Sequence, residues 1–69
     1  MRKFKNYQKV VVPNFLINGN RMDTWGIVEG YDPRSSKYLV TINSVIVYLE
    51  ESKLVDFEEF WNEQHKKDK

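Results

Sequence analysis

Cysteine is absent from this chain, and histidine occurs once, as His65. Without cysteine the chain has no disulfide framework and no thiolate metal site, which is typical of a protein from a reducing cytoplasm. His65 stands in a charged carboxy-terminal stretch with no second ligand at metal spacing, so we expect a solvated side chain. The three glycines do not form a phosphate-binding loop. We therefore expect no enzymatic activity and no cofactor.

Long hydrophobic runs are also missing. No segment approaches the roughly 18 apolar residues of a membrane span, and the basic start is not followed by the roughly 7–15 apolar residues of a signal peptide. We therefore expect a cytoplasmic protein without membrane attachment. The 69 residues correspond to one domain, which is near the lower size limit for a chain that has no disulfide or structural metal to stabilise it. Two tryptophans, four tyrosines and four phenylalanines partly offset this size, because each buries a large area.

The formal net charge of +1 hides an uneven distribution. Residues 1–22 contain five basic residues and no acid, whereas residues 50–69 contain seven acids and four lysines. The overall balance predicts no strong non-specific attraction to nucleic acid, but the basic amino end provides a local one. Such an end is also typical of a solvated arm. We expect residues 1–8 to form a flexible basic lead-in in which Phe4 and Tyr7 are available to pack.

The central part of the chain predicts three consecutive strands. Lys37–Ile42 and Val45–Glu50 are rich in β-branched and aromatic residues and are separated only by Asn43-Ser44, which is the spacing of a tight hairpin. Ser44 is a weaker choice than glycine for the second turn position, so a loop longer by one residue is the alternative. If the turn has two residues, it fixes the register by arithmetic. One face then pairs Ile42 with Val45, Val40 with Val47 and Tyr38 with Leu49, and the other pairs Thr41 with Ile46, Leu39 with Tyr48 and Lys37 with Glu50.

The first of these faces is apolar and is predicted to form the core. The second carries Leu39, Ile46 and Tyr48, and this patch needs a cover from the chain itself or from a partner. Upstream, Thr24–Tyr31 is a further strand, joined to the hairpin by a type I turn at 32–35. Its two glycines are typical of a bulge or a sharp coil.

The remaining segments are shorter. Lys9–Val12 is predicted to be a first strand that ends at Pro13, because proline cannot donate to a ladder. Asn14–Asp23 is then a ten-residue loop whose apolar residues suggest that it folds over one end of the sheet. After a single turn at 51–53, Leu54-Val55 is a short closing strand.

One helix is predicted from about Phe57 to Lys66. Asp56 is a suitable N-cap, and Glu59 has the position that completes a capping box. Phe57, Phe60 and Trp61 share one side of this helix, which is too short to be stable alone in water. We expect this side to dock on the patch of Leu39, Ile46 and Tyr48, and the alternative is a helix that pairs with another subunit or partner.

This order of elements resembles the small SH3-like barrel, the group of shapes that includes Tudor and KOW barrels. The segments that carry the resemblance are Trp25–Val28, Tyr38–Ile42 and Leu49–Leu54. It implies a mainly β fold in which residues 9–56 form a five-stranded SH3-like barrel and residues 57–69 form a packed amphipathic helix and a charged tail. The signature of proline-binding SH3 domains is absent. The lysine- and asparagine-rich composition also resembles products of phages and mobile elements from low-GC bacteria.

Three functions remain open. The first is a protein-interaction module that uses loop, aromatic and arginine side chains, which concentrate interface energy; its candidate residues are Phe15, Arg21, Trp25, Tyr31 and Arg34. The second is nucleic-acid binding through basic residues and exposed aromatics; its candidates are Lys3, Lys5, Lys9 and Arg21. The third is a structural or self-associating subunit of a phage-like assembly. We expect a monomer or a weak homodimer.

Overall fold

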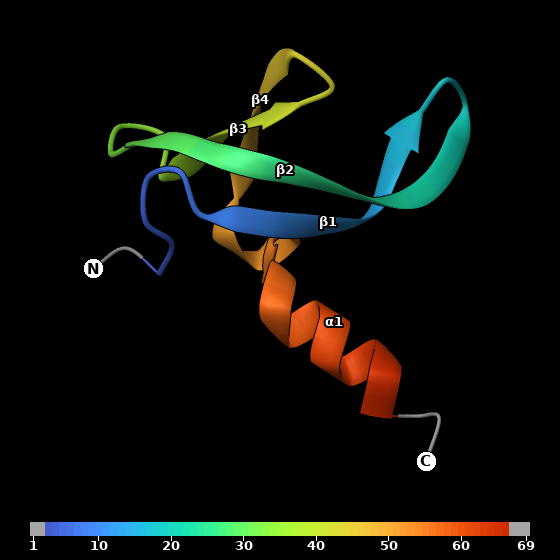
Figure 1. The fold of residues 1–69 in the computed structure, drawn as a ribbon. Coiled ribbons are helices and arrows are strands. Elements are labelled where there is room, and N and C mark those ends of the chain that lie inside the picture. Colours follow the sequence, from blue (N-terminus) through green and yellow to red (C-terminus); the bar gives the residue numbers. More distant parts are fainter. Residues whose placement is uncertain (1–2, 67–69) are drawn as a thin grey trace.

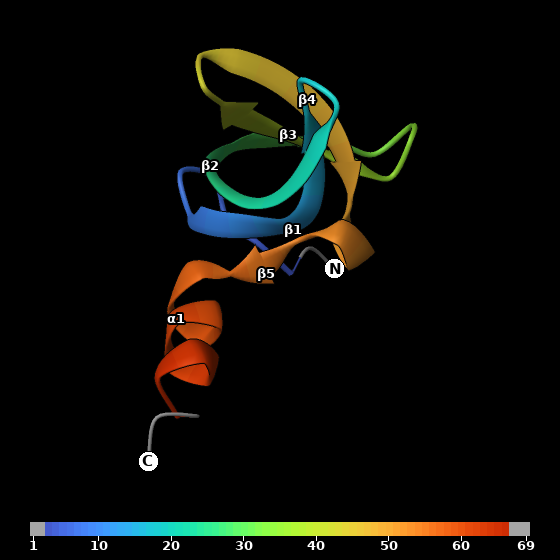
Figure 2. The same cartoon turned by 90° about the vertical axis from the view of Figure 1, so that its right-hand side faces the viewer.

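A computed structural model describes residues 3–66 of the chain, and it is mainly β. Five antiparallel strands form one sheet in the order β4-β3-β2-β1-β5, and one helix follows (Figures 1 and 2). Within residues 3–66 no ladder joins β4 to β5, so the sheet curls but is not closed into a barrel. The elements are β1 (Lys9–Ile17), β2 (Asn20–Asp32), β3 (Lys37–Ile42), β4 (Val45–Glu50), the 3-10 turn η1 (Glu51–Lys53), β5 (Val55–Asp56) and α1 (Phe57–Lys66).

The β3–β4 hairpin has the predicted bounds and the predicted register at all its pairs. Asn43 and Ser44 have φ angles of 51° and 67°, which is the pair of positive values that a type I′ turn requires. The side chains of Tyr38, Val40 and Ile42 are buried in the core, as expected for the apolar face. On β4, Val47 and Leu49 are only partly buried against this core.

The first hairpin differs from the prediction. β1 continues through Pro13 to Ile17, and the expected loop 14–23 is instead the end of β1, a turn at Asn18-Gly19 and the start of β2. Pro13 is tolerated because it lies in a β-bulge, where Pro13 and Asn14 together lie opposite one residue of β2. At such a position the ladder does not require a backbone N–H, which proline lacks. The backbone N–H of Asn14 donates to the Asp23 carboxylate at 3.1 Å.

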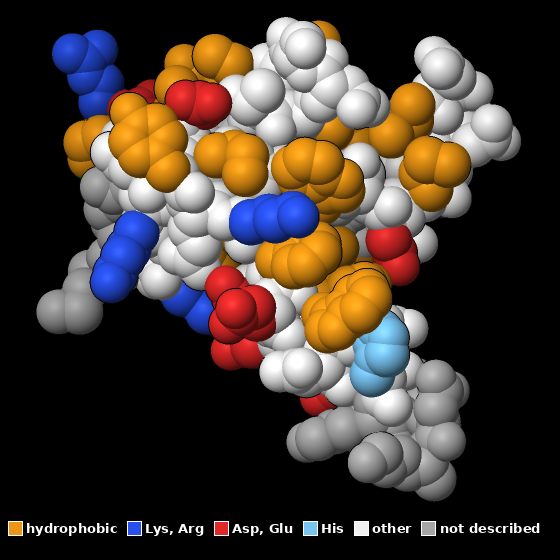
Figure 3. Space-filling view, viewed as in Figure 1, with side chains coloured by type: hydrophobic (Ala, Val, Ile, Leu, Met, Phe, Trp, Pro, Cys, Tyr) orange, Lys and Arg blue, Asp and Glu red, His pale blue; other side chains and the backbone are white. Residues whose placement is uncertain are grey.

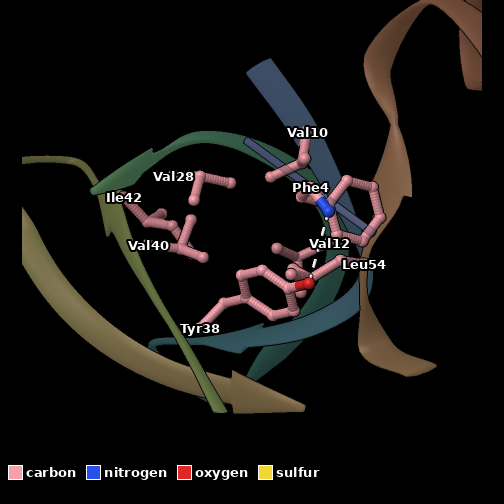
Figure 4. Close-up of a cluster of buried hydrophobic side chains, with 8 residues drawn as sticks. All are labelled: Phe4, Val10, Val12, Val28, Tyr38, Val40, Ile42 and Leu54. Atoms are coloured by element: carbon pink, nitrogen blue, oxygen red, sulfur yellow. Dashed lines mark hydrogen bonds between the residues drawn. The ribbon is translucent and has the colours of Figure 1, made fainter. Parts of the chain in front are cut away.

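The amino-terminal segment is also not a separate lead-in, at least from residue 3 onward. Phe4 is 2% exposed and packs in the core cluster with Tyr38 (Figure 4). Gln8 and Tyr7 extend the sheet, because the Tyr7 N–H donates to the Val28 carbonyl and the Val28 N–H donates to the Gln8 carbonyl. A single buried aromatic ring therefore anchors residues that the charge pattern assigned to a solvated arm. The core cluster consists of Phe4, Val10, Val12, Val28, Tyr38, Val40, Ile42 and Leu54.

The two glycines of β2 have different roles. A Cβ atom at Gly26 would lie 2.7 Å from the Thr41 carbonyl oxygen of β3, so only glycine permits this close approach of the strands. The register shifts between Val28 and Gly30, and this irregularity is the predicted bulge. A Cβ atom at Gly30 would have open space around it. Gly26 thus permits the close approach of β2 to β3, and Gly30 marks the bulge that curves β2.

The helix begins and ends as predicted, but it lies elsewhere. The Glu59 N–H donates to the Asp56 carboxylate at 3.2 Å, which confirms Asp56 as the N-cap. However, α1 contacts β1 and β5 and extends away from the sheet (Figure 1). Ile46 and Tyr48 remain 56% and 54% exposed, so the expected docking on their patch is wrong. β5 runs directly into α1, and this short connection holds the helix at the β1 end of the sheet.

Candidate partner-binding surface

The candidate site centres on a lysine held between two aromatic rings. The Lys9 ammonium nitrogen lies 4.6 Å from the centre of the Trp25 ring and 4.0 Å from that of the Phe57 ring. Both distances are within the range of a cation–π contact. Three elements therefore meet at one point, since Lys9 begins β1, Trp25 lies in β2 and Phe57 begins α1. Figure 3 shows hydrophobic side chains on both sides of a basic side chain on this face.

The aromatic surface continues along the helix. The rings of Phe57 and Trp61 stack with centres 6.5 Å apart and planes 11° apart, and the Trp61 and His65 rings lie 3.9 Å apart. His65 is fixed in place because its Nδ1 donates to the Trp61 carbonyl at 2.9 Å. The spacing of four residues puts all three on one side of the helix. Trp25 and Trp61 are each 55% exposed, so a row of accessible aromatic faces, the aromatic row (Trp25, Phe57 and Trp61), crosses the molecule.

The strand register explains why these residues meet. Lys9 and Val11 alternate with the core residues of β1 and therefore lie on its outer face. Val11 pairs with Trp25 on one side and with Val55 of β5 on the other. It is 3% exposed although it does not belong to the core cluster. A small second apolar contact between β1 and its neighbours thus lies beneath the aromatic row.

An open groove of ≈ 1270 Å³ adjoins this row, between the amino-terminal segment and the start of α1. Three lysines and two carboxylates line it, so its charge is nearly balanced. Tyr7, which is 75% exposed, adds a further ring to the two from the helix. The residues that line the groove are Lys3, Lys5, Asn6, Tyr7, Gln8, Lys9, Asp56, Phe57, Glu58, Trp61 and Asn62.

The walls of the groove are tied together by one side chain. The Gln8 amide nitrogen donates to the Asp56 carboxylate at 2.7 Å, and the Gln8 amide oxygen accepts the backbone N–H of Lys5 at 2.9 Å. Asp56 also caps the helix through its other carboxylate oxygen. The position of the amino-terminal segment is therefore coupled to that of α1.

Of the residues predicted for a protein partner, only Trp25 lies at this surface. Phe15 and Tyr31 are partly buried and pack against the core, with the Tyr31 ring 4.8 Å from that of Tyr38. Arg21 donates to the Asn14 carbonyl at 3.2 Å beside the β1–β2 bulge. Arg34 is exposed in the β2–β3 turn. The structure does not bring these five residues together.

The basic residues predicted for nucleic acid are grouped more closely. Lys3, Lys5 and Lys9 all line the groove, whereas Arg21 does not. The aromatic residues beside them are not among the predicted site residues. Phe57 and Trp61 were expected to dock on the sheet, Tyr7 was expected to be available for packing in the lead-in, and His65 was expected to be solvated. The four-residue spacing of Phe57, Trp61 and His65 was the signal that pointed to a continuous aromatic face.

Other kinds of site find little support. Among residues 3–66, no three His, Cys, Asp or Glu side chains gather closely enough to hold a metal ion. Helix α1 is the one α-helix in that range, and no helix there is both long and apolar enough to cross a membrane. No protein-family model matches the chain, and comparison with curated proteins and with solved structures likewise finds no match.

Proposed function

We propose that this chain is a small, non-catalytic module that binds a protein partner at the aromatic row and the adjoining groove. The observation that carries the proposal is the pair of half-exposed tryptophans, Trp25 and Trp61, held in place around the Lys9 and Phe57 contact. Tryptophan and tyrosine side chains are among the residues that concentrate binding energy in interfaces. Fixing them before binding lowers the entropy cost of association.

The chemistry of the groove indicates the kind of partner. Apolar or aromatic side chains of a partner segment fit the faces of Phe57 and Trp61, and a carboxylate fits the lysine side of the groove. Asp56 and Glu58 line the same groove and oppose a polyanion, because like charges that face each other are unfavourable. The matching partner is a protein segment with an aromatic anchor beside an acidic residue.

The fold proposed for this module is an SH3-like barrel. The antiparallel order, in which β5 returns to pair with β1 after a short 3-10 turn, supports this shape. The bulges in β1 and β2 also support it, because bulges allow a strand to curl around a small interior. A fold of this kind carries many functions, so the site and not the shape supports the binding role.

A selection of displayed random peptides on the purified protein tests the proposal. We expect enrichment of peptides with an aromatic residue next to an acidic one, and a loss of affinity of at least about tenfold with Trp61→Ala or Trp25→Ala, as for hot-spot residues. Arg34→Ala is the control, since Arg34 lies in the β2–β3 turn and does not line the groove. Enrichment that does not depend on either tryptophan would overturn the proposal.

Single-stranded nucleic acid is a second candidate, because Lys3, Lys5 and Lys9 share the groove with Tyr7. Rings that stack on bases beside lysines that contact phosphates are the usual means of binding single strands. Anisotropy of a labelled oligothymidylate at several salt concentrations separates the two candidates. Contacts from three lysines predict a slope of about −2 for log K against log salt. A flat dependence, or no binding, would leave the protein partner as the supported function.

A further inference from the structure

The β4 edge of the sheet is long and uncovered. Within residues 3–66, β4 pairs with β3 on one side and with no strand on the other. The opposite edge of the sheet is different, because β5 is only two residues long and runs straight into α1. The part of the sheet that the structure describes therefore has one edge on which another strand of ordinary length can pair.

The hairpin turn determines which backbone groups this edge offers. A two-residue type I′ turn makes Ile42 and Val45 a hydrogen-bonded pair, and such pairs alternate along an antiparallel ladder. The backbone groups of Val45, Val47 and Leu49 are thus directed to β3. Those of Ile46 and Tyr48 point outward, where their N–H and C=O groups are available to a new strand.

The side chains of this edge lack the devices that usually prevent pairing. No charged residue, proline or bulge interrupts β4 from Val45 to Leu49. Val45, Ile46 and Tyr48 are 59%, 56% and 54% exposed. Edge strands of monomers are usually short, charged, twisted by a bulge or covered. Apart from Glu50 at its end, β4 has none of these features, so its edge is suited to pairing with another strand.

We propose that β4 pairs with β4 of a second copy of this chain, antiparallel, across a two-fold axis at Val47. In this register Ile46 lies opposite Tyr48 of the second copy and Val45 lies opposite Leu49 of the second copy. Aliphatic and aromatic side chains then meet across the junction, which is a favourable cross-strand combination. The outward groups of Ile46 and Tyr48 form about four backbone hydrogen bonds in two pairs.

The charge distribution and the symmetry of the pairing favour β4 of a second copy as the strand that pairs with this edge. The one acidic residue of β4, Glu50, lies at its end and falls opposite Ser44 of the second copy, so no like charges meet. A register shifted to centre on Tyr48 would instead place Glu50 against Ile46. Because β5 is too short to pair with β4 of another molecule, the contact cannot repeat head to tail and closes as a dimer.

Sedimentation velocity of the full chain over a range of concentrations tests the dimer. We expect the mass to rise from 8.3 kDa toward twice that value as concentration increases. Ile46→Lys and Tyr48→Lys place a charge on the exposed edge and are expected to keep the protein monomeric with an unchanged circular dichroism spectrum. Trp61→Ala is the control at the other surface and should leave the dimer intact. A monomer at every concentration, or a dimer that survives Ile46→Lys, would overturn the proposal.

Cysteine cross-linking tests the register, because the chain has no cysteine of its own. The two copies of residue 47 form a non-hydrogen-bonded pair on the axis, where Cα atoms are about 4.5 Å apart and a disulfide fits. We expect Val47→Cys to form a disulfide-linked dimer under mild oxidation. Thr41→Cys, on the neighbouring strand β3, is the control and should form no disulfide-linked dimer. Cross-linking of Tyr48→Cys but not of Val47→Cys would overturn the axis at Val47.

Discussion

The phenol oxygen of Tyr38 lies 3.2 Å from the backbone nitrogen of Phe4, and the two rings meet edge to face with centres 5.5 Å apart (Figure 4). The same oxygen accepts the N–H of Lys3 at 2.8 Å and reaches a Glu51 carboxylate oxygen at 3.4 Å. A buried tyrosine hydroxyl needs such partners, because an unpaired polar group in the core is costly. Tyr38 thus joins the amino-terminal segment to the middle of the sheet and to the turn before β5.

Phe4→Ala is expected to destabilise the protein severely. Phe4 is 2% exposed, and truncation of a buried phenylalanine costs about 3–5 kcal/mol. A domain of this size has little stability to lose. We therefore expect the variant to be partly unfolded even without urea, or to unfold at a much lower urea concentration than the parent protein. Tyr7→Ala is the control, since Tyr7 is 75% exposed and should change the free energy of unfolding by less than about 0.5 kcal/mol.

Tyr38→Phe is expected to keep the ring packing but to leave the Lys3 and Phe4 amides without their acceptor. The free energy of unfolding should fall by about 1–3 kcal/mol. Hydrogen exchange followed by NMR should show faster exchange of these two amides than in the parent protein. Tyr48→Phe removes a hydroxyl from an exposed ring and should change neither quantity. Unchanged protection of the Phe4 amide in Tyr38→Phe would contradict the anchoring role.

The hairpin of β3 and β4 was predictable because its pattern is local. Two uninterrupted strands with a two-residue turn leave one register, and the structure has that register. The β1–β2 hairpin was missed because Pro13 reads as the end of a strand. The signal that it continues is the Asn14 bulge with φ of 56°, and a bulge depends on the partner strand, which sequence spacing alone does not supply.

The docking position of α1 was predicted wrongly for a similar reason. Sequence periodicity identified the apolar side of α1, and the cap at Asp56 fixed its start. What the helix contacts depends on where β5 pairs, and β5 is too short for its pairing with β1 to show in the pattern. Phe4 was available to pack, but the place where it is buried could not be predicted, since a single aromatic residue among lysines has no periodicity.

Gly26→Ala is expected to destabilise the sheet more than Gly30→Ala. A Cβ atom at residue 26 meets the Thr41 carbonyl oxygen at 2.7 Å and Val40 and Ile42 side-chain carbons at 2.7 and 2.9 Å, so the backbone of β2 or β3 must move. Overpacking of this kind costs about 1–3 kcal/mol. At residue 30 a Cβ atom meets nothing within 4 Å, and alanine should be neutral or slightly stabilising. Thermal denaturation of both variants measures the difference.

Asp56→Ala is expected to fray α1 and loosen the groove together. The substitution removes the helix cap, worth about 1 kcal/mol, and also the acceptor of the Gln8 amide. Far-ultraviolet circular dichroism should show a loss of helix while the sheet remains. Asp56→Asn keeps an oxygen that can cap and is the matched control. If Asp56→Ala leaves the helical signal unchanged, the cap does not stabilise α1.

Lys9→Met tests the contact at the centre of the aromatic row. Methionine keeps most of the length of the lysine side chain but lacks the charge, and each exposed cation–π contact contributes about 0.5–1 kcal/mol. We therefore expect a fall of about 1–2 kcal/mol in the free energy of unfolding, from the Trp25 and Phe57 contacts together. In a Trp61→Phe background, where Trp25 is the sole tryptophan, its emission should also shift. Lys5→Met removes a charge from the same groove and leaves the Lys9 contacts in place, so it should produce neither change. Equal effects of the two substitutions would mean that the groove responds to net charge, and that the rings do not hold Lys9 in particular.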